Sequence, residues 1–137
     1  MKQISICKIE YEKLYKDYIW SNFNMRNDSQ LITYYRIEYK KTSLLEIRCT
    51  RMNDYSVNLE IGAIRIKKLR KALIETINFL KETNEELYMI STFIVSGDNL
   101  GLWMLKKVGF TVDAVWRECV EISCRKRDIE LLSFECR

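Results

Sequence analysis

The chain has 137 residues, 47% hydrophobic and 31% charged, which is the length and composition of a globular protein with a single core. It contains no histidine, which excludes Ser-His-Asp and Cys-His nucleophilic catalysis and removes the commonest metal ligand. The five cysteines are dispersed singly, so we expect neither a disulfide framework nor a metal site. The net charge of +4 is too small to favour nucleic acid as a partner.

Two features of the chain bear on its location. No run of about 18 or more apolar residues occurs, so we expect no membrane-spanning helix. Residues 1–13 mix acidic and basic side chains too early for a secretion signal. These features predict a cytoplasmic protein with no membrane partner.

The first half of the chain is predicted to be mostly strand. Residues 3–9 alternate polar and apolar side chains, which is typical of a strand at the edge of a sheet. From Glu10 the apolar side chains fall at helical spacing, so we expect a helix to about Trp20 or Phe23 and then a polar loop. Three strand-like runs follow, and the short polar segments that join them favour an antiparallel meander. These runs are 31–39, 44–52 and 55–64.

The second half is predicted to contain two helices around a central strand. Apolar side chains recur every three or four positions through residues 65–82, which predicts an amphipathic helix. Residues 87–95 are apolar on both alternating faces, as in a central strand that is covered on two sides. Asp98 is expected to cap a short helix that ends at Gly109.

Two further strands complete the predicted sheet, at 111–122 and 128–136. Trp116 and Phe134 within them are expected in the core, because large aromatic side chains usually are buried. An edge strand near either end of the chain could pair with a second copy, so a homodimer is one assembly that the pattern allows.

Two segments resemble the GNAT family of N-acetyltransferases, in particular its ribosomal-protein-acetylating subgroup. Residues 98–110 begin with Asp-Asn and end with Lys-Val-Gly-Phe, similar to the family segment that ends in Lys-x-Gly-Phe, with Leu105 where the family often has a tyrosine general acid. Residues 60–62, Glu-Ile-Gly, are similar to the family strand that enters the site. The glycine-rich loop that wraps the pyrophosphate in the family is missing after them, so we expect a degenerate loop.

The order of the predicted elements is also that of a domain of this family. The resemblance therefore implies one α/β (α+β) domain over residues 1–137, with a mixed, mostly antiparallel central sheet splayed in the middle and helices on both faces. It implies transfer of an acetyl group from acetyl-coenzyme A to a primary amine of a small molecule or a protein, by direct attack and without a metal. The alternative is a catalytically silent binding or regulatory domain that has lost the pyrophosphate loop.

The resemblance and the charge pattern mark one group of residues for the cofactor. Main-chain amides at the strand end and at the start of the next helix would hold the pyrophosphate, because a helix amino terminus attracts anions. Basic side chains crowd this helix start, where the helix dipole disfavours them by about 0.3–1 kcal/mol each. They favour a bound anion there, although they could also form a solvated basic face. The predicted cofactor-binding residues are Ile61, Gly62, Ala63, Ile64, Lys67, Lys68, Arg70, Asp98, Asn99 and Lys106.

The resemblance implies particular roles at the second helix. Asp98 stands at the position of a family asparagine that bonds the pantetheine arm. It is either that ligand or a helix cap that leaves Asn99 as the ligand. Lys106, or its neighbour Lys107, is the basic side chain implied for the adenosine 3′-phosphate.

Glu60 is the expected catalytic residue. An attacking amine must lose a proton, and a chain without histidine has few groups that can accept it. The alternative role for Glu60 is that of a strand carboxylate that pairs with Arg48. The oxyanion of the reaction would be stabilised by a backbone N–H within residues 61–64.

Overall fold

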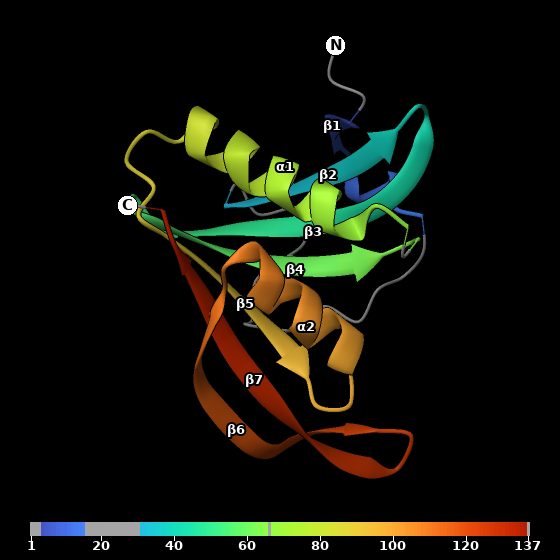
Figure 1. Ribbon diagram of the computed structural model, residues 1–137, viewed down its shortest axis with the longest axis vertical. Helices are drawn as coiled ribbons and strands as arrows, with labels where there is room; N and C mark the ends of the chain where they lie inside the picture. The colour runs from blue at the N-terminus through green and yellow to red at the C-terminus, as the bar shows by residue number, and fades with distance from the viewer. Residues whose placement is uncertain (1–3, 16–30, 66, 137) are drawn as a thin grey trace.

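Residues 4–15, 31–65 and 67–136 are described by the computed structural model, and they form one seven-stranded sheet with two α-helices (Figure 1). The elements are β1 Ile4–Ile9, β2 Ile32–Tyr39, β3 Thr42–Asn53, β4 Ser56–Ala63, α1 Leu69–Thr83, β5 Met89–Val95, α2 Asn99–Val108, β6 Thr111–Ile122 and β7 Arg125–Glu135. The strand order is β1-β2-β3-β4-β5-β7-β6, and all neighbours are antiparallel except β4 and β5. The predicted α+β domain with a mixed, mostly antiparallel sheet is therefore confirmed.

The helix predicted from Glu10 does not form in the described residues. Tyr11–Lys13 is a single 3-10 turn, and the chain is already extended at Leu14, where ψ is 144°. Side chains of the sheet instead form hydrogen bonds with main-chain groups of this segment. Arg36 donates to the Lys13 carbonyl, and the Tyr15 N–H donates to Glu46 Oε1 at 2.7 Å. Main-chain groups with such partners need no helix to satisfy them. The rest of the predicted helix and loop lies in 16–30, outside the described residues.

The two described helices lie together on one face of the sheet and contact each other (Figure 1). Helices were expected on both faces; most of the helix predicted from Glu10 lies outside the described residues. α1 begins at Leu69, later than the predicted start at Arg65, because Lys68 has a left-handed backbone with φ of 63°. An L-residue in that conformation does not continue a right-handed helix.

The core lies between these helices and the sheet. Leu45, Ile47 and Ile90 on the strands and Leu80 on α1 are at most 1% exposed. The buried side chains of α1 recur at the predicted helical spacing: Leu69, Ala72, Leu73, Thr76, Ile77 and Leu80. This stripe is what holds α1 on the sheet, since each buried aliphatic side chain contributes about 1.5–3 kcal/mol.

The hairpin of β6 and β7 differs from expectation at its tip. Its turn is only Ser123 and Cys124, both with positive φ, as in a two-residue hairpin turn, so β7 begins at Arg125. Trp116 on β6 is 50% exposed, so its predicted place in the core is wrong. β6 is an edge strand with β7 as its neighbour, and most of its side chains are exposed.

Truncation of the α1 stripe should destabilise the protein. Leu80→Ala is expected to lower the free energy of unfolding by about 2–5 kcal/mol, because it leaves a cavity under the helix. Ile74→Ala on the same helix changes a side chain that is 37% exposed and should stay within about 0.5 kcal/mol of the parent. Urea denaturation followed by circular dichroism measures both. Equal losses would contradict the assignment of the buried face.

The cysteines should differ in reactivity. Burial raises the pKa of the Cys49 thiol to about 12, so almost none of the reactive thiolate is present at pH 8. The exposed Cys7, Cys119 and Cys124 should be alkylated in the native protein, whereas Cys49 should react only after unfolding. Peptide mass spectrometry after iodoacetamide treatment at pH 8 reads this out. Native labelling of Cys49 as fast as that of Cys7 would contradict its burial.

Candidate active site

β4 and β5 are paired over only part of their length. Residues 56–59 pair with residues 89–92, and among the described residues the pairing ends at Leu59 and Thr92. At this last pair the Thr92 hydroxyl donates a hydrogen bond to the Leu59 carbonyl, with 2.7 Å between the oxygens. Beyond it the strands diverge, which confirms the splay predicted for the middle of the sheet.

The divergence leaves main-chain groups of β4 facing a gap. The Ile64 N–H donates to the Leu44 carbonyl at 2.9 Å, so it faces β3. Because successive residues of a strand direct their N–H groups alternately to the two sides, the Gly62 N–H also faces β3, and those of Ile61 and Ala63 face the gap. Two of the four main-chain positions predicted for the cofactor therefore direct donors into the gap.

β5 borders the same gap from the other side. The Met89 N–H donates to the Tyr55 carbonyl at 3.1 Å, on the side of β4, and the Ser96 N–H donates to the Asp128 carbonyl at 2.8 Å, on the side of β7. By the same alternation, the N–H groups of residues 93 and 95 are directed towards β4. Amides of both strands therefore line the splay.

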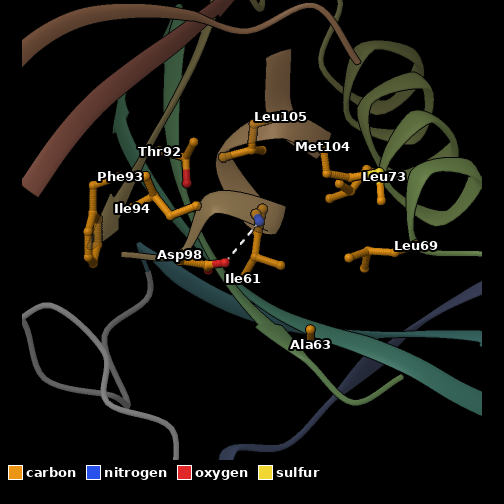
Figure 2. A pocket seen from close by; sticks show the side chains of 11 residues that line it. Ile61, Ala63, Leu69, Leu73, Thr92, Phe93, Ile94, Asp98, Met104 and Leu105 are labelled. Carbon is orange, nitrogen blue, oxygen red and sulfur yellow. Dashed lines mark hydrogen bonds between the residues drawn. The ribbon is translucent and has the colours of Figure 1, made fainter. Parts of the chain in front are cut away.

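A cleft of about 490 Å³, including the solvent at its mouth, lies beside this gap between α1 and α2 (Figure 2). Its walls are mostly apolar, and side chains from both helices and both diverging strands converge on it. The described residues that line it are Ile61, Ala63, Leu69, Leu73, Thr92, Phe93, Ile94, Asp98, Gly101, Met104 and Leu105. Apolar walls with a few polar groups suit a long, largely uncharged ligand arm.

The start of α2 supplies the acidic side chain of this cleft. Asp98 is the N-cap, and its carboxylate accepts the Gly101 N–H at 2.9 Å (Figure 2). A Cβ on Gly101 would lie 2.6 Å from both Asp98 Oδ2 and Ile94 Cδ1, so the cap and the open cleft depend on glycine there. Asn99 is exposed in the first turn, whereas Lys106 is exposed in the last turn, roughly 12 Å from Asp98 along the axis.

The start of α1 combines free helix amides with positive charge. Lys68 is the N-cap, but its side chain makes no capping hydrogen bond, and no acidic residue lies in the first turn. Its ammonium instead lies 4.5 Å from the centre of the Tyr39 ring. Lys67 and Arg70 are exposed on either side of the helix start. These features leave the positive end of the α1 dipole without a compensating carboxylate from its own first turn.

Glu60 lies on the face of β4 opposite the cleft, because it alternates with Ile61, which lines the cleft. It stands directly across from Arg48 on β3, with 3.5 Å between Glu60 Oε1 and Arg48 Nη1. The two side chains are 4% and 2% exposed. The pairing with Arg48 considered as an alternative therefore exists, and Glu60 is a buried carboxylate next to the splay.

A second ion pair occupies the same face of the sheet. Arg36 on β2 and Glu46 on β3 approach to 2.9 Å, and Glu46 is fully buried. Burial raises the pKa of the neighbouring Tyr34 hydroxyl, although the adjacent Arg48 lowers it in part. Charged residues at alternating positions of an apolar strand, such as Glu46 and Arg48, indicate a charged face of the sheet. Sequence reasoning nevertheless did not identify Glu46 and Arg36 as part of the site.

The part of the chain that the structure describes contains neither a metal-binding cluster nor a membrane-spanning helix. No group of three or more His, Cys, Asp or Glu side chains there is placed to hold a metal ion. None of the described helices is long and apolar enough to span a membrane.

Solved structures of acetyltransferases share this fold. No protein-family model matches the chain, and no curated protein sequence does. The spermidine/spermine N-acetyltransferase from Vibrio cholerae is similar with a TM-score of 0.75 and 14% identity, over 97% of this chain and 92% of that one. The ribosomal-protein-S18-alanine N-acetyltransferase from Escherichia coli is similar with a TM-score of 0.70 and 12% identity, over 96% and 93%. At such identities the similarity shows the fold alone: this chain has the GNAT acetyltransferase fold, and the ribosomal-protein-acetylating subgroup stays a prediction.

Proposed function

We propose that this protein transfers an acetyl group from acetyl-coenzyme A to a primary amine of a small molecule or a protein. The observation that carries the proposal is the splay between β4 and β5, with the N–H groups of Ile61 and Ala63 directed into it. The acetyltransferase fold supports it as well.

Each part of acetyl-coenzyme A would meet a matching part of the cleft. The apolar walls would hold the pantetheine arm. The N–H of Ile61 or Ala63 would donate to the thioester carbonyl, whose oxygen becomes negative during attack. The first N–H groups of α1 have no acceptor within the helix, so they and the cations Lys67 and Arg70 would hold the pyrophosphate.

The other predicted cofactor residues fit this proposal to different degrees. Asn99 would be the ligand at the start of α2, because the Asp98 carboxylate already caps the helix. Lys106 would meet only a part of the cofactor that extends along α2, since it lies in the last turn. Lys68 already contacts an aromatic ring, and it would reach a phosphate only by leaving Tyr39.

The chemistry would join the two faces of the sheet at the splay. The amine nitrogen attacks the thioester carbon, a C–N bond forms, and the C–S bond breaks as the coenzyme A thiolate leaves. Glu60, on the face away from the cleft, would accept the amine proton. Leu105 lines the cleft where the resemblance implies a tyrosine acid, so the thiolate would take its proton from water.

A silent binding or regulatory domain is the second candidate. It is favoured by Leu105, which cannot donate a proton, and by the short connection between β4 and α1, residues 64–68. Such a domain could keep the fold and lose turnover. Ligand binding and turnover, measured separately, distinguish the two candidates.

Acetyl-coenzyme A should stabilise the protein through the start of α1. At 100 times its dissociation constant it should add about 2.7 kcal/mol to stability, seen as a rise in melting temperature. Arg70→Glu should weaken this binding about tenfold, because it replaces a cation beside the pyrophosphate with an anion. Without ligand the variant should be as stable as the parent or slightly more so, since a carboxylate suits a helix start.

Lys81→Glu is the matched control, because it makes the same charge change in the last turn of the same helix. It should leave acetyl-coenzyme A affinity unchanged. No stabilisation of the parent protein by millimolar acetyl-coenzyme A would contradict the proposed cofactor.

Replacement of Glu60 should affect turnover more than cofactor binding. Glu60→Gln removes the proton acceptor and should lower the transfer rate by about 10²–10⁴-fold. The stabilisation by acetyl-coenzyme A should persist, because the cleft lies on the other face. Initial rates of coenzyme A release, measured below the melting temperature of the variant, test this.

Glu46→Gln controls for loss of a buried ion pair, since it breaks the contact with Arg36 on the same face. Both variants should lose stability, because each removes a buried carboxylate that pairs with an arginine. Only Glu60→Gln should lose most of its turnover. Equal rates in the two variants would remove Glu60 as the base.

A further inference from the structure

Asn58 on β4 carries a polar atom that its surroundings do not satisfy. Its Oδ1 is buried and has no hydrogen-bond partner among the described residues. Most buried polar atoms in native proteins are paired, because an unpaired one destabilises the folded state. An unpaired amide oxygen beside a candidate active site therefore points to an acceptor position for a ligand.

Ser91 on β5 determines the orientation of this amide. Asn58 Nδ2 donates to Ser91 Oγ at 3.0 Å, and Ser91 Oγ donates to the Val57 carbonyl at 3.4 Å. A serine hydroxyl has one proton, so Ser91 cannot also donate to Asn58. If the amide were flipped, Ser91 would have to donate to Oδ1 and give up the Val57 carbonyl, so one hydrogen bond would replace two. The orientation with Oδ1 as the open acceptor is therefore the better-paired one.

Asn58 lies at the closed end of the splay, on the same face as Glu60. It pairs with Ser91 immediately before the last pair of the two strands, Leu59 and Thr92. Residues two apart on a strand share a face, so the Cα atoms of Asn58 and Glu60 are roughly 6.6 Å apart on the side away from the cleft. The two side chains therefore project from alternate positions on one face of β4, where the splay begins.

We propose that Asn58 Oδ1 accepts a hydrogen bond from the acceptor amine and holds it beside Glu60, an inference that rests on the proposed acetyl transfer. A primary ammonium group has three protons, so it can donate to Asn58 and Glu60 at the same time. An alcohol has one proton and can donate to only one of them. The two residues therefore select a primary amine over an alcohol as the acetyl acceptor.

Asn58→Leu tests this proposal, because leucine has a similar shape and removes the unpaired oxygen. The KM for the amine should rise about tenfold to a hundredfold, as expected when a hydrogen bond to a charged group is lost. The dissociation constant of acetyl-coenzyme A should not change, and the melting temperature should not fall. Spermidine and a peptide amide with an amino-terminal alanine are the acceptor probes.

Two further variants separate binding of the amine from a structural role. Asn58→Asp keeps an oxygen in place and should restore most of the affinity for the amine. Ser91→Ala frees the amide to turn and should raise KM less than Asn58→Leu does. A purely structural role would instead lower the melting temperature of Asn58→Leu and leave KM unchanged.

The outcomes distinguish the inference from the proposed function. Transfer by the parent protein with an unchanged KM in Asn58→Leu, or a KM in Asn58→Asp as high as in Asn58→Leu, overturns the role of Asn58 alone. No transfer by the parent protein to either probe contradicts the proposed function, and the inference fails with it.

Discussion

The candidate site depends on how few residues of β4 and β5 are paired. Their parallel pairing stops at Leu59 and Thr92, yet each strand keeps an antiparallel partner on its other side, β3 for β4 and β7 for β5. The sheet therefore stays continuous while its middle opens. The amides that this opening exposes need acceptors, because main-chain donors are rarely left unsatisfied in a folded protein.

The two faces of the sheet differ in chemistry around this opening. The helix side is apolar and forms the cleft, whereas the other side carries the half-buried pair Arg36–Glu46 and the buried pair Arg48–Glu60. Buried ion pairs contribute little net stability, because desolvation offsets most of their attraction. Arg36 and Glu46 also hold the main chain at Lys13 and Tyr15, which gives that pair a structural role. The Arg48–Glu60 pair lies next to the splay. In the proposed reaction a thioester reaches the splay from one face and an amine from the other.

Sequence reasoning identified some of these residues and missed others for physical reasons. The cap at Asp98 and the end of α2 at Gly109 follow from local chemistry, and the structure has both. Asn58 was not identified from the sequence, because the sequence does not show whether the side-chain oxygen of an asparagine in a strand accepts a hydrogen bond. Trp116 was expected in the core from its size, but its strand lies at the edge of the sheet.

The sequence by itself determined most helices and strands and the buried face of α1, because these follow from the spacing of apolar side chains within short segments. Only the tertiary structure decided where β4 and β5 part, that Glu60 faces Arg48 instead of the cleft, and that 11–13 form a single turn. These outcomes depend on contacts between residues far apart along the chain, such as Tyr15 with Glu46 and Asn58 with Ser91. Local spacing carries no information about such pairs.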